Sequence, residues 1–273
     1  MALRAKNEAR RRHCPPGACK GSIFNLIQIM FFRERTRQEE YFDTPDLSIR
    51  ERQAAHRELD RVNRLFRFDH PFTSRLPEWL GEEKCASLEI LDVGAGSGCL
   101  GRTLSDWAAR RGWCWRFTNL DLHPMPQNPG DTTRQVAGSA LDLPFDKESF
   151  DLVVASQMTH HLKDEEVVRH WKEAWRVSRD AIFISDLHRN AGFYAVLGVV
   201  MRLLFLDKNL RADGLISVKR GFRRREWLKL ASQAELPDAQ VWVYYGTRIM
   251  LQARKKPFVP GASESIAKYP RPD

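Results

Sequence analysis

The chain has 273 residues, of which 42% are hydrophobic and 29% are charged, and its formal net charge is +9. This composition is typical of a globular protein, and no apolar run reaches the roughly 18 residues that a membrane-spanning helix needs. The cysteines are scattered and odd in number, which argues against a disulfide framework and indicates a reducing compartment; they are Cys14, Cys19, Cys85, Cys99 and Cys114. Cys14 and Cys19 lack a second pair that would complete a four-ligand site, so we expect no bound metal.

The positive charge is concentrated in two short patches. Residues 1–20 carry six basic residues and one acidic residue, and residues 208–229 carry eight and two. The rest of the chain is therefore slightly acidic. A solvated helix face explains the second patch about as well as a binding surface does.

The first 40 residues differ in character from the rest. A basic stretch containing Pro-Pro-Gly precedes SIFNLIQIMFF, an apolar run at residues 22–32. A basic region followed by a short apolar run is the outline of a secretory signal, but no small-residue cleavage site follows it. We expect residues 1–40 to be a disordered or loosely attached basic extension. Met30 as the true start and an anchor on a membrane surface are the alternatives.

Helix and strand patterns alternate from residue 50 onward. Apolar spacing and stop signals predict helices over 50–68, 98–112, 164–179 and 224–236. Two prolines, Pro71 and Pro77, are expected to break the chain after the first helix. Short apolar runs predict strands over 88–93, 113–122, 134–140, 149–158, 181–187, 239–245 and 248–254. Such alternation predicts a parallel sheet with helices on both faces. The link between the last two strands is too short for a crossover, so one of them should run antiparallel.

The insert NAGFYAVLGVVMRLLFL, residues 190–206, lies between the fifth and sixth strands. It is apolar but too short to span a bilayer. We expect a lid helix packed on the sheet edge, because apolar stripes are usually core. It could also form an apolar wall for a substrate, with the basic residues that follow it attracting anionic lipid.

The segment LDVGAGSG holds three glycines at alternate positions, Gly94, Gly96 and Gly98, directly after the first strand. Ligands of parallel α/β sheets bind at the carboxyl ends of the strands, and the helix N-terminus that follows favours a negative group. Asp121 ends the second strand, where an acid accepts hydrogen bonds from a ribose diol. The two features together predict a ribose-containing ligand.

The segments LDVGAGSG, NLDLHP and GSALDLPFDKESFDLVVASQMTHHL together resemble class I S-adenosylmethionine-dependent methyltransferases. The subgroup is the small-molecule type related to the ubiquinone and menaquinone biosynthesis methyltransferases. The resemblance runs from about Leu88 to Arg254. It implies a Rossmann-like α/β fold with a seven-stranded, mostly parallel sheet and an antiparallel last strand. We expect this domain, with an N-terminal helical cap, over residues 41–256 and a flexible tail over 257–273.

The resemblance also implies S-adenosyl-L-methionine as the cofactor. The residues that would bind it are Asp92, Gly94, Ala95, Gly96 and Gly98 in the glycine-rich loop, Asp121 on the ribose, Leu122, Ser139 and Ala140 around the adenine, and Ser156 and Gln157 beneath the sulfonium. The family usually has an acid where Ser139 stands. Serine accepts a hydrogen bond from the adenine amino group more weakly than a carboxylate does.

Candidate catalytic residues follow the fourth and fifth strands. His160 and His161 follow the fourth strand, and Asp186 and His188 end the fifth. Parallel strands bring all four to one rim, where their placement suits a base and an orienting partner for an acceptor such as a phenol. Alternatively, the histidines only shape their loop, and Asp186 only caps the following helix.

We expect methyl transfer to a hydrophobic small-molecule acceptor at a phenolic or quinol-type oxygen, by a cytoplasmic enzyme that could contact a membrane peripherally. Carbon methylation of a prenylated quinone ring is the first alternative. RNA methylation, prompted by the charge, and cofactor binding without catalysis are the others. Nucleic acid is disfavoured, because SQMTHH after the fourth strand contains neither an Asn-Pro-Pro-Tyr-like motif nor a Pro-Cys nucleophile.

Overall fold

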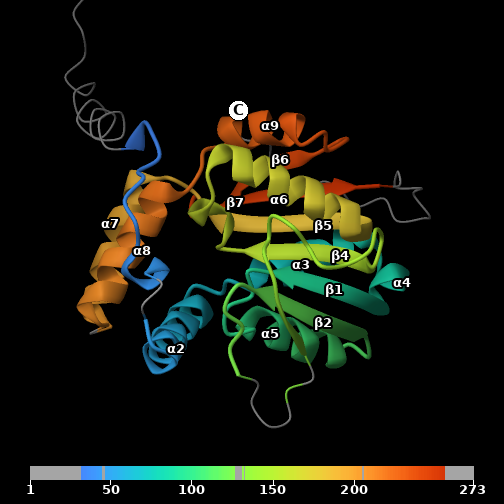
Figure 1. Cartoon of the computed structure of the whole chain (residues 1–273), viewed down its shortest axis with the longest axis horizontal. Coiled ribbons are helices and arrows are strands. Elements are labelled where there is room, and N and C mark those ends of the chain that lie inside the picture. Colours follow the sequence, from blue (N-terminus) through green and yellow to red (C-terminus); the bar gives the residue numbers. More distant parts are fainter. Residues whose placement is uncertain (1–31, 45–46, 127–130, 132, 205, 256–273) are drawn as a thin grey trace, which may run out of the picture.

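The computed structural model describes residues 32–44, 47–126, 131, 133–204 and 206–255 (Figure 1). The first 31 residues of the predicted extension, and the predicted tail at 257–273, lie outside the described residues. None of the described helices is long and apolar enough to cross a membrane.

Seven strands form one sheet in the order β3-β2-β1-β4-β5-β7-β6. The strands are β1 (Ser87–Val93), β2 (Cys114–Asp121), β3 (Arg134–Ala137), β4 (Phe150–Ser156), β5 (Ser178–Leu187), β6 (Gln240–Tyr244) and β7 (Arg248–Arg254). Neighbouring strands are parallel, except that β7 runs antiparallel to both β5 and β6. The predicted seven-stranded sheet with an antiparallel last strand is therefore confirmed. Strand order reverses between β1 and β4, which opens a crevice at the carboxyl edge.

Helices cover both faces of this sheet and extend beyond its carboxyl edge (Figure 1). They are α2 (Ile49–Leu65), α3 (His70–Leu80), α4 (Glu82–Cys85), α5 (Cys99–Ala109), α6 (Asp164–Val177), α7 (Ala191–Leu203), α8 (Lys208–Arg220) and α9 (Arg224–Gln233), with short 3-10 helices η1 (Tyr41–Asp43) and η2 (Thr159–His161). On β4, Val153 and Ala155 belong to the core under α6 and α9. Leu152 and Val154 belong to the core under α3 and α5. Burial on both faces explains the unbroken apolar run of this strand.

Helix α3 occupies the stretch where two prolines predicted a break. Pro71 lies in the first turn, where a backbone N–H has no partner within the helix, so no hydrogen bond is lost there. Pro77 lies inside the helix and removes one backbone donor. Phe72 and Leu76 are fully buried against the sheet, and this packing retains the helix despite Pro77.

The predicted lid insert forms α7, and a second helix that the sequence did not predict, α8, follows it. Asn190 caps α7 by accepting the N–H of Phe193 at 3.0 Å. Buried residues of the two helices pack with Phe32 and Leu187 into an apolar cluster of their own. Figure 1 places both helices beyond the carboxyl edge of the sheet, on the same side as α2.

Residues 32–40, which the sequence analysis assigned to a loosely attached extension, pack closely against the domain. Phe32 is buried, and its ring lies edge-on to that of Tyr194 on α7 with the centroids 5.4 Å apart. The fully buried Arg189 donates hydrogen bonds to the carbonyls of Phe32 and Arg33 at 2.9 and 3.2 Å. These carbonyls satisfy a buried guanidinium, so this segment belongs to the folded domain.

Candidate active site

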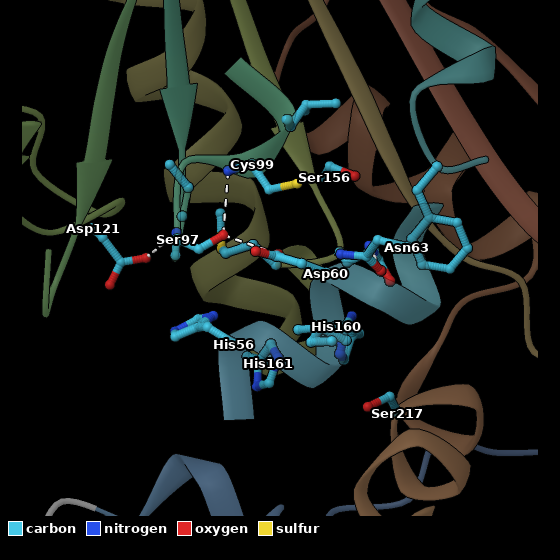
Figure 2. Close-up of a pocket in the computed structure, with 18 of the residues that line it drawn as sticks. His56, Asp60, Asn63, Ser97, Cys99, Asp121, Ser156, His160, His161 and Ser217 are labelled. Carbon is cyan, nitrogen blue, oxygen red and sulfur yellow. Dashed lines mark hydrogen bonds between the residues drawn. The ribbon is translucent and has the colours of Figure 1, made fainter. Parts of the chain in front are cut away.

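A cavity of about 720 Å³ lies at the carboxyl edge of the sheet (Figure 2). The loops after β1, β2, β3 and β4 line it, together with side chains from α2, α7 and α8. Glu40 and Asp43, which precede α2, also line it. The glycine-rich loop and the segment around His160 and His161 therefore share one chamber.

The glycine-rich loop presents backbone to the cavity. Gly94 and Gly96 have φ values of 70° and 54°, in the left-handed region that favours glycine. A Cβ on Gly94 would collide with the side chain of Met158, and a Cβ on Gly96 would lie 2.7 Å from Cε1 of His56. Both the backbone conformation and the close neighbours exclude side chains here.

Gly98, the third glycine, does not line the cavity. It precedes α5 with a φ of 71°, and a Cβ there would lie 2.6 Å from the amide nitrogen of Asn119 on β2. The absence of a side chain allows α5 to pack closely on β2. The structure therefore gives Gly98 a packing role, and it places only the first two glycines at the cavity.

Asp92 brings a buried carboxylate to the cavity. It is 2% exposed, and its Oδ2 has no hydrogen-bond partner among the described residues. Burial, followed by the negative charge of Asp121, raises the pKa of Asp92 to about 8. A bound ammonium group would satisfy the free oxygen and balance the charge. The site therefore fits the amino-acid end of S-adenosylmethionine.

Asp121 lies at the carboxyl end of β2, beside the glycine-rich loop. Its Oδ2 accepts the N–H of Gly96 at 2.8 Å, and its Oδ1 accepts the N–H of His123 at 2.9 Å. A carboxylate has about four lone-pair sites, so both oxygens can still accept from the two hydroxyls of a ribose. The backbone bonds hold the carboxylate in place for that contact.

The other residues that the resemblance implied also line the cavity; they are Ala95, Leu122, Ser139, Ala140, Ser156 and Gln157. The Oγ of Ser139 accepts the N–H of Leu141 at 3.1 Å and so stabilises its own turn. Gln157 has a φ of 56°, and its N–H donates to the carbonyl of Ser185 at 2.9 Å. This bond holds the loop after β4 against β5.

Helix α2 covers the glycine-rich loop, a feature that sequence reasoning described only as a helical cap. Asp60 accepts a hydrogen bond from Oγ of Ser97 at 2.9 Å, and Asn63 accepts one from Nε2 of Gln157 at 3.1 Å (Figure 2). His56 lies against Gly96, and burial lowers its pKa. Polar residues at positions 56, 60 and 63, spaced for one helix face, were the available signal.

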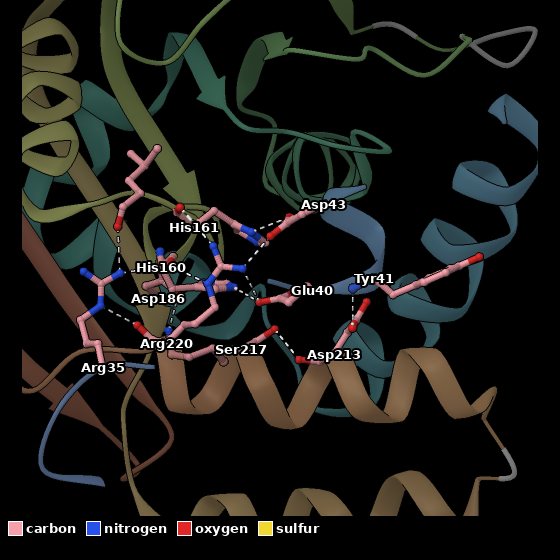
Figure 3. Close-up of polar contacts among 12 residues, drawn as sticks. Arg35, Glu40, Tyr41, Asp43, His160, His161, Asp186, Asp213, Ser217 and Arg220 are labelled. Atoms are coloured by element: carbon pink, nitrogen blue, oxygen red, sulfur yellow. Dashed lines mark hydrogen bonds and ion pairs between the residues drawn. The ribbon is translucent and has the colours of Figure 1, made fainter. Parts of the chain in front are cut away.

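His160 and Asp186 form a buried pair at the carboxyl ends of β4 and β5. Nδ1 of His160 donates to Oδ1 of Asp186 at 2.6 Å, and the backbone N–H of His160 donates to Oδ2 at 2.8 Å (Figure 3). Burial favours the neutral acid, but the attraction and hydrogen bonds of His160 outweigh it and keep the pKa of Asp186 below its ordinary value. Asp186 does not cap α7, because Asn190 does.

Two carboxylates from the segment before α2 face these histidines (Figure 3). Oε1 of Glu40 lies 3.7 Å from Nε2 of His160, and Oδ1 of Asp43 lies 2.9 Å from Nδ1 of His161. Arg220 bridges the two carboxylates, with Nη1 at 3.3 Å from Glu40 and 2.6 Å from Asp43. Burial raises the pKa of Glu40 to about 7, although His161 and Arg220 act to lower it. No sequence motif indicated these two acids.

His188, the fourth predicted catalytic residue, does not line the cavity. Its Nδ1 lies 3.0 Å from the carbonyl of Gly246, in the turn between β6 and β7. The residue directly follows β5, and its side chain contacts the turn between β6 and β7 instead of lining the cavity. The structure brings His160, His161 and Asp186 together and leaves His188 outside.

One further part of the cavity wall is apolar. Helix α7 contributes Phe193, Leu197 and Met201, and α8 contributes Leu210. Val62 lies on α2, and Phe68 lies in the turn after it. All six side chains are less than 9% exposed. The insert, predicted as a packed lid helix that could also form a substrate wall, has an inner face that belongs both to an apolar core cluster and to the cavity lining.

Comparison with known proteins agrees with this geometry. Residues 91–183 match the methyltransferase-domain family. No curated protein sequence matches the chain.

Several solved structures share the fold. The plantazolicin methyltransferase BpumL, in complex with SAH (S-adenosylhomocysteine), is 13% identical, with a TM-score of 0.56 over 79% of this chain and 92% of that chain. An S-adenosylmethionine-dependent methyltransferase structure from Methanococcus maripaludis is 13% identical, with a TM-score of 0.51 over 80% and 99%. PigF with SAH is 19% identical, with a TM-score of 0.50 over 86% and 68%.

At such identities the structural likeness establishes the fold, while the matched domain covers the strands that carry the glycine-rich loop, Asp121 and the floor of the cavity. The free carboxylate of Asp92 and the side-chain-free loop supply the groups that the cofactor needs. Residues 91–183 therefore match a methyltransferase domain, and the chain has the fold of S-adenosylmethionine-dependent methyltransferases.

Proposed function

We propose that this enzyme transfers the methyl group of S-adenosylmethionine to a hydroxyl oxygen of a hydrophobic small molecule, of phenolic or quinol type. One observation carries the proposal. The cavity that holds the cofactor residues is also lined by an apolar wall and by the histidines at 160 and 161. An acceptor there would have its ring against the wall and its hydroxyl near the histidines.

The chemistry explains why this combination is needed. Methyl transfer from a sulfonium is an in-line displacement, so much of the rate comes from holding the two reacting atoms close and aligned. A phenolic hydroxyl has a pKa near 10, so it also needs a group that favours loss of its proton. Glu40, His160 and His161 are titratable groups at the cavity that can meet this need.

The apolar wall favours an acceptor with a large hydrocarbon part. Burial of apolar surface contributes about 25 cal/mol per Å², so a ring or chain placed against Phe193, Leu197 and Met201 would gain most of its affinity there. Oxygen is favoured over ring carbon because the polar groups converge on the place where a hydroxyl would lie. Carbon methylation of a prenylated ring is the alternative outcome of the test below.

The test is methyl transfer from methyl-labelled S-adenosylmethionine to a lipid extract, to a panel of substituted phenols and quinols, and to total RNA. We expect label in the phenols or lipids, bound as a methyl ether by mass spectrometry. Label on ring carbon would replace the oxygen assignment. Label only in RNA would overturn the proposal.

The outer face of α7 supports peripheral contact with a membrane as part of this proposal. Val196, Val199 and Leu203 are 57%, 58% and 70% exposed and share one face of the helix. Arg202 and Lys208 are exposed beside them and would attract anionic lipid. We expect flotation with vesicles of phosphatidylcholine and phosphatidylserine, and loss of flotation in the variant Val199→Asp. Equal flotation of both proteins would remove the membrane contact.

A further inference from the structure

Glu40, His160 and His161 form a group that can share one ion. Each residue offers one ligand atom, and these atoms all lie within 4.8 Å of one another. Glu40 and His160 are buried, and His161 is partly buried. Among the described residues, this is the one group of three or more His, Cys, Asp or Glu side chains with this arrangement. We call it the Glu–His–His cluster.

We propose that the Glu–His–His cluster binds a divalent transition-metal ion, and that this ion holds the acceptor hydroxyl for methyl transfer. The second half of the proposal rests on the proposed function. The first half stands on the ligand geometry, and it differs from the expectation of no metal drawn from the cysteine spacing alone. That expectation considered only cysteines, whereas these ligands come from segments about 120 positions apart, 40 and 160–161.

His160 is oriented as a metal-binding histidine is. Asp186 accepts a hydrogen bond from Nδ1–H of His160 at 2.6 Å. The backbone N–H groups of His160 and Leu187 also donate to that carboxylate, at 2.8 and 2.6 Å. The proton on Nδ1 leaves Nε2 with a free lone pair, which faces Glu40 at 3.7 Å. Histidines that bind metals almost always donate their other N–H to a carboxylate or carbonyl in this way.

His161 repeats the arrangement with a different acid. Its Nδ1 lies 2.9 Å from Oδ1 of Asp43, and the imidazole rings of His160 and His161 are tilted by 36° with their centroids 4.2 Å apart. Arg220 bridges Asp43 and Glu40 and donates to the carbonyl of His161 at 3.1 Å. Carboxylates and a guanidinium therefore hold all three candidate ligands in place. Arg220 takes up only part of the acceptor capacity of Glu40, since each carboxylate oxygen has two lone-pair sites.

The ligand types indicate which ions fit. Two neutral imidazoles and one carboxylate suit zinc and related ions such as cobalt, and catalytic zinc sites with His₂Glu ligands keep one coordination position open. Magnesium is disfavoured, because it prefers oxygen ligands. All three residues line the cavity, so the open position would face the acceptor.

In the reaction, coordination to the ion acidifies the acceptor hydroxyl, as it acidifies metal-bound water. The O–H bond breaks and its proton leaves to solvent. An oxygen lone pair then forms the bond to the methyl carbon while the carbon–sulfur bond breaks. That electron pair stays on sulfur, which leaves neutral S-adenosylhomocysteine and the methyl ether.

The test is to treat the full chain with a chelator, titrate it with Co²⁺ alone and monitor the visible absorption bands of bound Co²⁺. The metal content of the dialysed protein is measured as well. We expect one Co²⁺ per chain and loss of at least 10-fold in affinity in each of Glu40→Gln and His161→Gln. Asp43→Asn should weaken binding less, because it removes only an orienting group. His188→Gln is the matched control, since His188 lies outside the cavity, and binding should not change. Calorimetry with S-adenosylmethionine confirms that each variant is folded.

Absence of Co²⁺ binding to the wild-type chain, or binding that Glu40→Gln and His161→Gln leave unchanged, would overturn the metal site. Methyl transfer is then measured separately with and without chelator. Transfer that persists after metal removal shows that the histidines act without an ion and leaves the proposed function standing. Co²⁺ binding without methyl transfer to any phenol or lipid would support the metal site and contradict the proposed function.

Discussion

At the scale of single residues, the cofactor site contains two carboxylates in different environments. Asp121 has each oxygen engaged by a backbone N–H. Asp92 is buried, with one oxygen that has no partner among the described residues. The first is suited to neutral hydroxyls and the second to a cation, so we propose that Asp121 binds the ribose and Asp92 the ammonium group of the cofactor.

Replacing Asp121 tests the ribose contact. Hydrogen bonds to a charged group contribute about 1.5–3 kcal/mol, so Asp121→Ala should weaken S-adenosylmethionine binding about 10- to 100-fold. Titration calorimetry measures this directly. Asp106→Ala, at an exposed position on α5, is the control and should bind normally. Unchanged affinity in Asp121→Ala would remove the ribose assignment.

Asp92 should make the cofactor-free protein sensitive to pH. Its pKa in the folded chain is about 8, above the value near 3.9 of an unfolded chain. The folded protein therefore holds a proton that the unfolded chain releases. The contribution of this group to stability is fully present below about pH 4 and is lost as the pH rises through about 8.

The variant Asp92→Asn removes this titration. It should raise the free energy of unfolding of the cofactor-free protein at pH 8.5 by about 1–3 kcal/mol, because the folded variant no longer buries a charge that has no partner. It should also weaken cofactor binding, since the ammonium group loses its counter-charge. Urea unfolding at pH 5 and pH 8.5 checks this. A stability difference between variant and wild type that is the same at both pH values would contradict it.

At the scale of elements, α2 and α7 close the cavity in different ways. Helix α2 uses polar contacts, from Asp60 to Ser97 and from Asn63 to Gln157, which cover the loop that the cofactor must reach. Helix α7 uses apolar contacts, with Leu197 turned inward and Val196 turned outward. In the proposed function, the polar contacts of α2 lie over the cofactor loop and the apolar side chains of α7 contact the acceptor.

Adjacent residues on α7 provide a matched pair for the acceptor wall. Leu197→Ala should raise the KM for a hydrophobic acceptor several-fold and leave S-adenosylmethionine affinity unchanged, because the side chain lines the cavity and is only 5% exposed. Val196→Ala should change neither, because Val196 is 57% exposed. Steady-state kinetics at a temperature well below both melting points measures this. Equal KM values would place the acceptor elsewhere.

At the scale of the whole molecule, a buried and a partly buried arginine join the first described residues to the rest. Arg189 is fully buried and donates to the carbonyls of Phe32, Arg33 and Gly221 and to Glu226. Arg35 donates to the carbonyls of His160, Leu162 and Arg220. The segment that carries Glu40 and Asp43 is thereby attached to the connection after β5 through Arg189 and to the loop that contains the histidines through Arg35.

Replacing Arg189 tests this attachment. Arg189→Leu removes the Arg189 hydrogen bonds of Glu226 and of three carbonyls, and unsatisfied buried polar groups cost about 1–3 kcal/mol each, so we expect a total of about 3–5 kcal/mol. We expect the free energy of unfolding to fall by about that amount in urea. The control is Arg225→Leu, an exposed position on α9, which should change it by less than about 0.5 kcal/mol. A similar small change in both would show that the segment is not held by Arg189.

The sheet could be predicted because its strands are buried on both faces and therefore read as continuous apolar runs, as in residues 150–156. Helix α8 could not, because its buried positions include Asp213, Ser217 and Arg220, which have partners elsewhere in the fold. Helix α3 was obscured by Pro77, whose cost is met by packing of Phe72 and Leu76. A local sequence pattern shows the unfavourable free energy of a proline or of a buried polar residue, but it does not show the tertiary contacts that offset it.

The sequence by itself determined the residues of the proposed cofactor site, because Asp92, Gly94, Gly96 and Asp121 lie at the carboxyl ends of their own strands or in the loop that directly follows. Only the tertiary structure decided which side chains stand at the proposed acceptor site. Glu40 and Asp43 meet His160 and His161 across about 120 residues of chain, and His188 contacts the turn before β7 instead of the cavity, although it follows the same edge. Strand order brings loops to an edge, but the side chains that meet there depend on packing between segments that no local pattern connects.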